Sequence, residues 1–150
     1  YLAEALAQRV DFLSIGTNDL SQYLLAIDRG NPQVSGRLDP LHPAVLRALR
    51  QVVEGAARAG KPVSVCGEMA SDPGCALLLL GMGINSLSIS AAALSRVKWA
   101  IRSVDSQHLK ALAEEALRLE KPEAIRQLLD KALENAGLDR LRSPAAQMPT

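Results

Sequence analysis

The segment Lys61–Ala70, KPVSVCGEMA, decides the fold of this chain, because a short apolar run ends there at a cysteine and a glycine. Side chains alternate between the two faces of a strand, so Val63 and Val65 share one face while Ser64 and Cys66 share the other. In a parallel sheet the apolar face packs against helices. In such folds the catalytic and ligand-binding residues lie where the strands end. A thiol at that position can act as a nucleophile, a metal ligand or an acid.

Two further segments, Leu13–Ile15 and Leu87–Ile89, repeat the pattern of a serine between two large apolar residues. Helical segments separate the three predicted strands, so the order is βαβαβ and the sheet is parallel. Start signals such as proline and aspartate, and stop signals such as glycine, delimit the helices. The predicted helices are residues 43–59, 73–80, 94–102, 105–119 and 122–136, with a further helix starting near Leu20.

We interpret the chain as an α/β protein that contains the last three βα units of a (β/α)8 TIM barrel, followed by C-terminal helices. The small residues that share one strand face suit the crowded interior of a closed barrel. Eight βα units need about 250 residues, and the chain begins in mid-pattern at Tyr1, so we expect a piece of a longer protein. A smaller α/β domain is the structural alternative. We assign residues 1–138 to the barrel portion and 139–150 to a disordered tail.

The composition is that of an ordinary globular protein, with 48% hydrophobic and 22% charged residues among 150. A net charge of +1 argues against a nucleic acid as partner. No apolar stretch approaches the ~20 residues of a membrane span, and no leader pattern is seen, so we expect a cytoplasmic protein without a membrane partner. Two cysteines in hydrophobic segments fit a reducing compartment.

Three motifs occur in a fixed order: Asp11–Tyr23 (DFLSIGTNDLSQY), Ala26–Asn31 (AIDRGN) and Val65–Pro73 (VCGEMASDP). Together they resemble the phosphoenolpyruvate-utilising enzymes, and most closely the phosphoenolpyruvate-protein phosphotransferases, or enzyme I. The resemblance extends from about Val10 to Arg102 and continues more weakly through the last helices. The stretch Asp39–Leu49 (DPLHPAVLRAL) is more similar to the nitrogen-related branch than to the sugar-system branch.

The resemblance implies a phosphoryl transfer from phosphoenolpyruvate to a histidine of the same protein, and then to a phosphocarrier protein through a separate N-terminal domain. Neither His42 nor His108 matches the phosphorylated histidine of the family. Cys66 matches the family's proton donor, which protonates the enolate that the transfer leaves behind. A thiol with an ordinary pKa near ~8.5 is mostly protonated at neutral pH and can supply this proton. The resemblance also implies a homodimer.

The remaining site residues follow from the same resemblance. Asp19 matches a Mg²⁺ ligand, Asn18 matches a phosphate contact, and Arg29 can clamp phosphate or carboxylate with its planar fork of donors. Gly67 and Ser90 line the expected rim, where Gly67 lets backbone amides approach a ligand. The family's second metal carboxylate comes from earlier strands, so we expect this chain alone to be inactive and to bind Mg²⁺ weakly or not at all.

Simpler explanations exist for each residue. Cys66 can be a buried structural cysteine, Thr17 or Asn18 can merely cap the next helix, and Cys75 is expected in the core. Glu68 points away from Cys66 if the strand continues, so it receives no catalytic role.

Two other functions stay open: a pyruvate phosphate dikinase or phosphoenolpyruvate synthase, and a non-catalytic dimerisation module. The unpaired edge of the first strand predicts self-association.

Overall fold

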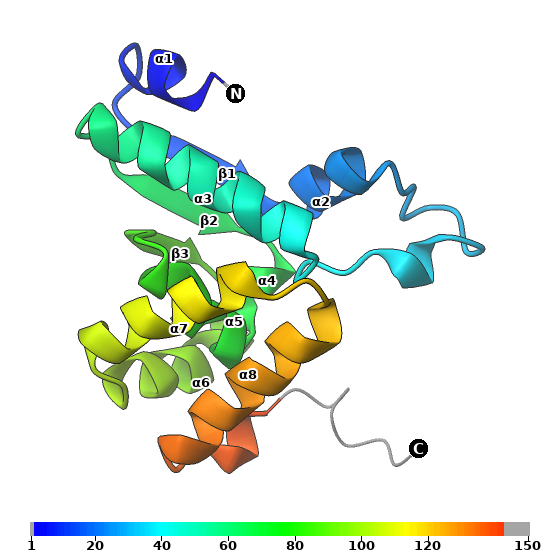
Figure 1. The fold of residues 1–150 in the computed structure, drawn as a ribbon, viewed down its shortest axis with the longest axis vertical. Coiled ribbons are helices and arrows are strands. Elements are labelled where there is room, and N and C mark those ends of the chain that lie inside the picture. The colour runs from blue at the N-terminus through cyan, green and yellow to red at the C-terminus, as the bar shows by residue number, and fades with distance from the viewer. Residues whose placement is uncertain (1, 143–150) are drawn as a thin grey trace.

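A computed structural model describes residues 2–142 of the chain, and its centre is a three-stranded parallel sheet (Figure 1). The strands β1 (Leu13–Gly16), β2 (Val63–Cys66) and β3 (Ser86–Ser88) lie in the order β1-β2-β3. The predicted strands and their parallel βαβαβ order are confirmed. The third strand ends at Ser88 rather than Ile89, because only Ser86–Ser88 pair with β2.

The predicted helices are present, with ends shifted by a few residues. Asp72 and Asp105 cap two of them, each accepting a hydrogen bond from a backbone N–H of the first turn, at 2.9 and 2.7 Å. Within residues 2–142, no helix combines the length and the apolar composition that a membrane crossing requires. The helices are α1 (Ala3–Ala7), α2 (Thr17–Leu25), α3 (Pro43–Arg58), α4 (Glu68–Ser71), α5 (Pro73–Gly81), α6 (Ala91–Arg102), α7 (Ser106–Arg118) and α8 (Pro122–Asn135), with 3-10 helices η1 (Ser35–Arg37) and η2 (Asp139–Leu141).

The two faces of the sheet differ as the strand pattern predicts. Ile15, Val63 and Val65 are buried in the core on the face that α3 crosses. On the opposite face, Ser14, Cys66, Ser86 and Ser88 are all exposed. The described residues therefore form a sheet with one covered face and one open face of small side chains.

One hydrophobic core joins the sheet to the C-terminal helices. The helix α5 is apolar on all sides, because α4, α6, α7 and α8 surround it. Gly81 at its end permits close contact with α7, since a side chain there would collide with the carbonyl oxygen of Leu109. Helices α7 and α8 thus belong to the same domain as the strands.

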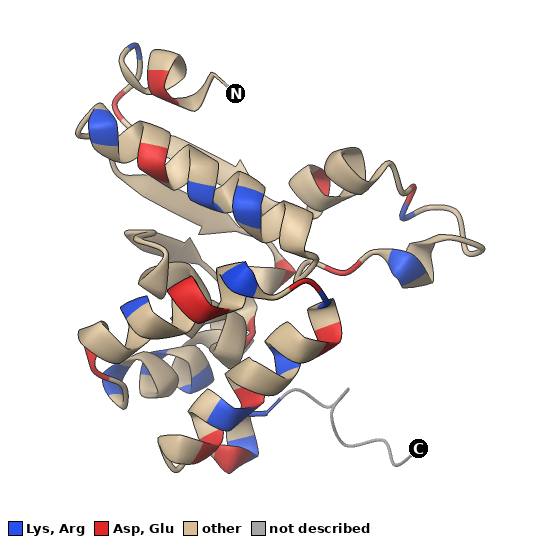
Figure 2. Ribbon diagram, in the orientation of Figure 1, with Lys and Arg blue, Asp and Glu red and all other residues tan. Residues whose placement is uncertain are grey.

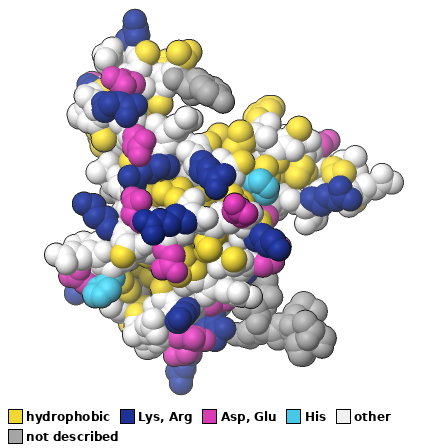
Figure 3. All heavy atoms as spheres, viewed as in Figure 1, with side chains coloured by type: hydrophobic (Ala, Val, Ile, Leu, Met, Phe, Trp, Pro, Cys, Tyr) yellow, Lys and Arg dark blue, Asp and Glu magenta, His cyan; other side chains and the backbone are white. Residues whose placement is uncertain are grey.

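Charged side chains of both signs are interleaved along α3, α7 and α8 (Figure 2). The same face in Figure 3 shows patches of hydrophobic atoms between these charges. Arg58, near the end of α3, forms an ion pair with Glu4 of α1 at 2.6 Å. This charge pattern agrees with the net charge of +1.

The predicted start of the disordered tail at residue 139 is wrong. Asp139–Leu141 form η2, and Leu141 is buried in the core. Arg142 forms ion pairs with Asp130 and Glu134 of α8. These contacts order residues 139–142, whereas the rest of the predicted tail, residues 143–150, lies outside the described residues.

Candidate active site

The strands β1 and β2 end at the same rim, because their register places Gly16 opposite Cys66. The thiol of Cys66 is on the open face of the sheet, with its Sγ 3.6 Å from the carbonyl oxygen of Ile15. Cys66 is exposed, so the explanation that it is a buried structural cysteine is wrong. A solvent-accessible thiol at a strand end can exchange protons with a ligand and with water.

Thr17 begins α2 and connects it to β2. Its side chain is fully buried, and its hydroxyl donates a hydrogen bond of 3.2 Å to the carbonyl oxygen of Cys66. The N-cap of α2 is Gly16, and no side chain caps the helix. The capping explanation for Thr17 and Asn18 is therefore wrong, because the helix starts three residues before the predicted Leu20 and both residues lie inside its first turn.

Gly67 allows the turn after β2 to pass against this first turn of α2. Its φ is +126°, a value that side chains rarely permit. An added Cβ would overlap the Thr17 hydroxyl and lie 3.2 Å from Oδ1 of Asn18. The glycine thus brings the backbone after Cys66 next to the amide of Asn18.

Asp19 and Arg29 form an ion pair beside this turn, with 3.1 Å between Nη2 and Oδ1. Both side chains are more than half exposed, at 67% for Asp19 and 52% for Arg29. Exposed pairs of this kind contribute little to stability. The pair can therefore separate when a ligand binds. The Asp19 carboxylate can then bind a cation, and the Arg29 guanidinium can bind an anion.

A hollow of about 270 Å³ adjoins this pair. It brings together the predicted residues Asn18 and Arg29, and it also contains Glu68, to which we assigned no role. The reason given for excluding Glu68 is wrong, because in a continuing strand residues 66 and 68 would share a face. In the structure β2 ends at Cys66 and α4 starts at Glu68. Cys66 and Asp19 are not among the lining residues, which are Asn18, Ser21, Arg29, Leu38, Pro40 and Glu68.

Asp19 fits a Mg²⁺ site as one oxygen ligand. Proteins usually bind Mg²⁺ through one or two carboxylates, with water and substrate phosphate completing the shell. Within residues 2–142, no three His, Cys, Asp or Glu side chains gather into a metal site. Any Mg²⁺ held by Asp19 therefore depends on further ligands.

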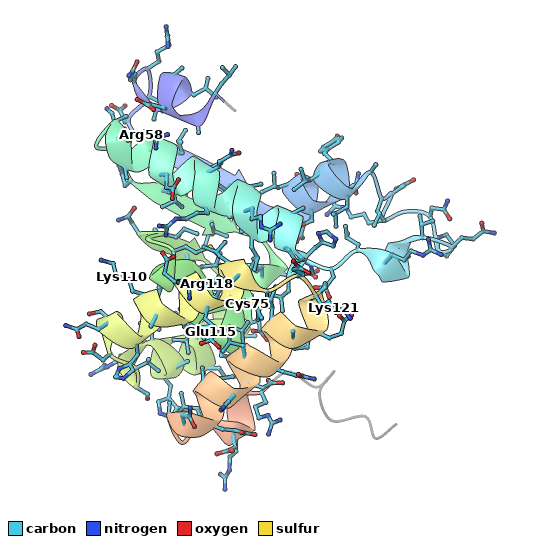
Figure 4. All side chains as sticks on the ribbon, in the orientation of Figure 1. Arg58, Cys75, Lys110, Glu115, Arg118 and Lys121 are labelled. Carbon is cyan, nitrogen blue, oxygen red and sulfur yellow. The ribbon has the colours of Figure 1, made fainter. Side chains whose placement is uncertain are left out.

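The other reactive side chains have structural environments. Cys75 is buried beneath α7 and α8 (Figure 4), and burial, together with the nearby Asp72 carboxylate, raises the pKa of its thiol well above the ordinary value. His42 is the N-cap of α3 and accepts a hydrogen bond from the Ala44 N–H at 3.2 Å. His108 is exposed on α7. Ser90 is the N-cap residue of α6.

The fold is of the parallel α/β class, in which ligands bind at the carboxyl ends of the strands, and at this rim the sheet carries an accessible thiol and the Asn18-Asp19 helix start. The chain belongs to the family described as PEP-utilising enzyme, PEP-binding domain, whose sequence model matches residues 1–106. The predicted resemblance to phosphoenolpyruvate-utilising enzymes is confirmed.

Curated relatives extend the similarity into the C-terminal helices. The phosphoenolpyruvate-protein phosphotransferase of Haemophilus influenzae is 47% identical over 131 residues, which cover 87% of this chain and 23% of the relative. The protein of the same name from Cupriavidus necator is 50% identical over 125 residues, covering 81% and 21%. The phosphoenolpyruvate-dependent phosphotransferase system protein of Salmonella typhimurium is 39% identical over 138 residues, covering 92% and 18%. The chain spans about a fifth of the length of these relatives.

Proposed function

We propose that this chain is part of a phosphoenolpyruvate-protein phosphotransferase, which transfers the phosphoryl group of phosphoenolpyruvate to a histidine of the same protein and on to a phosphocarrier protein. Two relatives of that name, at 47% and 50% identity, support the proposal. The observation that carries it is the pairing of Gly16 with Cys66, since this register brings the thiol and the Asn18-Asp19 turn to one rim.

The chain would supply the last three βα units of a (β/α)8 barrel. Two features support this arrangement: the open sheet face carries small side chains, and large apolar side chains are exposed near both edges of the sheet. Leu6 and Phe12 are exposed beside β1, and Leu94 and Trp99 are exposed on α6 after β3. Further strands and helices of a closed barrel would cover these groups and pair the free strand edges.

In this function Cys66 is the general acid. Cleavage of the P–O bond leaves its electron pair on the enolate, and the Cys66 S–H then delivers its proton to the methylene carbon to give pyruvate. The resulting thiolate regains a proton from water, which reaches the exposed thiol. Asn18 donates its amide N–H to a phosphate oxygen, and Arg29 leaves Asp19 to clamp phosphate or carboxylate.

Asp19 would hold the Mg²⁺, which when bound supplies positive charge to the phosphate oxygens. Because no three His, Cys, Asp or Glu side chains gather into a metal site among the described residues, the chain alone should bind Mg²⁺ and phosphoenolpyruvate weakly. Isothermal titration of the 150-residue chain with phosphoenolpyruvate and Mg²⁺ tests this statement, and micromolar binding would contradict it. A cytoplasmic homodimer is also proposed, on the family resemblance and on the composition.

The substitution Cys66→Ala in the full-length protein tests the catalytic assignment. We expect phosphoryl transfer from phosphoenolpyruvate to fall by about 10²-fold or more, the usual contribution of a general acid. The rate of pyruvate release measures it. Cys75→Ala is the matched control, because it removes the buried thiol and should leave the rate near that of the unmodified protein. Full activity of Cys66→Ala would contradict the assignment.

The same assay separates the alternative functions. A pyruvate phosphate dikinase or phosphoenolpyruvate synthase needs a nucleotide, whereas the proposed enzyme needs none. A non-catalytic dimerisation module would show no transfer at all and would associate equally well with and without the thiol. The rate measured with and without nucleotide, together with sedimentation of the Cys66→Ala variant, therefore distinguishes all three.

A further inference from the structure

The connection between α2 and α3, residues 26–42, forms one wall of the hollow beside Asn18. Three of the lining residues, Arg29, Leu38 and Pro40, come from it. Residues 28–33 are exposed without interruption, and Figure 1 shows the connection extending away from the sheet. Apart from the exposed pair of Arg29 with Asp19, its hydrogen bonds at this point are local, such as the one from the Gly30 N–H to Oδ1 of Asp28 at 2.8 Å. The early part of the wall therefore has little support from the core.

The end of the connection is held by an arginine from far along the chain. Nη2 of Arg126, on α8, donates to both carboxylate oxygens of Asp39, at 3.2 and 3.0 Å. The same carboxylate accepts the Leu41 N–H at 2.9 Å and so shapes the turn before α3. The two side chains are only 29% and 25% exposed, so the pair is shielded from solvent more than the pair of Asp19 and Arg29 is.

Arg126 also lies beside the hollow. A crevice of about 170 Å³ contains Arg126 and shares two lining residues, Pro40 and Glu68, with the 270 Å³ hollow. Pro40 lies between Asp39 and Leu41, in the turn that the Asp39 carboxylate shapes by its bond to the Leu41 N–H, so this carboxylate supports the wall shared by the two cavities. Arg126 itself lies beyond residue 106, where the match to the family model ends.

We propose that Arg126 is a positioning residue for substrate binding, acting through Asp39 to hold the wall formed by residues 38–41. This inference rests on the proposed function for the identity of the substrate, phosphoenolpyruvate. The clamp, by which we mean the pair of Arg126 and Asp39, rests on geometry alone. Because one nitrogen, Nη2, contacts both oxygens, the ammonium group of a lysine can reproduce the interaction.

The test compares Arg126→Gln, Arg126→Lys and Asp39→Asn in the full-length protein. Arg142→Gln is the matched control, because Arg142 pairs with Asp130 and Glu134 of the same helix. We expect Arg126→Gln and Asp39→Asn to raise KM for phosphoenolpyruvate by up to about tenfold, the usual size for a lost hydrogen bond between charged groups, with kcat changed by less than about twofold. Arg126→Lys should keep the original KM, and so should Arg142→Gln.

Hydrogen exchange measured by mass spectrometry gives a readout that does not depend on activity. Peptides covering residues 26–42 should exchange faster in Arg126→Gln and Asp39→Asn, whereas in Arg142→Gln faster exchange should be confined to the end of α8. Unchanged exchange in residues 26–42, or an equal rise of KM in the control, would overturn the inference. If the unmodified protein does not turn over phosphoenolpyruvate, the proposed function fails, and the exchange data still decide whether the clamp exists.

Discussion

The hydroxyl of Thr17 donates a hydrogen bond of 3.2 Å to the carbonyl oxygen of Cys66, and so ties the first residue of α2 to the last residue of β2. The two residues are 49 positions apart in the chain. Since Thr17 is fully buried, water cannot replace this bond. The thiol-bearing strand end and the Asn18-Asp19 turn therefore keep a fixed relative position.

Replacing Thr17 by valine keeps the shape of the side chain and removes the hydroxyl. We expect a loss of about 1–3 kcal/mol in the free energy of unfolding, because the carbonyl of Cys66 loses its partner, the hydroxyl of the buried Thr17. Urea unfolding followed by circular dichroism measures it. Thr17→Ser keeps the hydroxyl and should cost only about 1 kcal/mol for one lost methyl group. Equal stability of the valine variant and the unmodified protein would contradict the importance of this bond.

Replacing Gly67 by alanine places a Cβ against the Thr17 hydroxyl and near Oδ1 of Asn18, on a backbone with φ of +126°. Strain of this kind costs about 1–3 kcal/mol. The control is Gly36→Ala, where an added Cβ meets no atom within 4 Å, and its effect should stay within about 0.5 kcal/mol. Thermal unfolding of both variants provides the comparison, and similar midpoints for the two would count against the packing described at Gly67.

The two thiols should differ strongly in reactivity toward a disulfide reagent such as DTNB. Cys66 is exposed and should react first, whereas Cys75 is buried and its raised pKa keeps it protonated. Reaction at Cys75 requires local opening, which slows it by about 10²-fold or more. Cys66→Ala should therefore abolish the fast phase. A fast phase that survives in this variant would show that Cys75 is accessible.

Ala26 ends α2 in the left-handed conformation, with φ of +53°. This conformation is strained for alanine, whereas glycine adopts it without a steric cost. Ala26→Gly should therefore raise the free energy of unfolding by about 0.5–1 kcal/mol. Ala59 occupies the same position at the end of α3 but has φ of −90°. Ala59→Gly should therefore reduce stability, since glycine only adds freedom to the unfolded chain there. Opposite signs in chemical denaturation are the expected result, and a common sign would refute this explanation.

Asp130 should make stability depend on pH. Burial raises the pKa of its carboxyl group, and Arg142 only partly offsets this. A raised pKa means that the folded state binds the proton more tightly than the unfolded state. The contribution to stability is thus complete below the ordinary pKa near ~3.9 and is lost as the pH rises through the raised value.

The variant Asp130→Asn cannot ionise at this position. Its stability relative to the unmodified protein should therefore increase between about pH 4 and pH 7. Denaturation at several pH values across this range measures the difference. If the difference moves the other way, attraction to Arg142 outweighs the cost of burying the carboxylate.

Local patterns predicted most elements of the fold. The alternation in Val63–Cys66 and the stop at Gly60 correspond to a strand and a helix end, and Gly60 has a positive φ of 65°. The four-residue helix α4 was missed, because residues 68–71 are too few to show a helical period. The start of α2 was misplaced for a different reason, since Thr17 is held there by a bond to β2 that no local pattern reveals.

The candidate site was predicted in part. The residues at the two strand ends were identified, and Asn18 and Arg29 do line one hollow. Glu68 was dismissed by a wrong use of strand alternation, since residues two apart in a strand share a face, and α4, which carries Glu68, was not predicted. Arg126 went unnoticed because it is 87 residues from its partner Asp39, and one arginine on an amphipathic helix looks like any solvated surface residue.

The sequence alone determined the type of most strands and helices and the pattern of small and apolar side chains around Cys66, because alternation and helical period depend on near neighbours in the chain. Only the tertiary structure decided which groups meet: Gly16 with Cys66, Gly67 with Asn18, and Asp39 with Arg126. Those pairings arise from the packing of one core across the whole chain. Cys66 therefore owed its place on the serine-bearing strand face to its strand pattern, and its exposure and its neighbours to the fold.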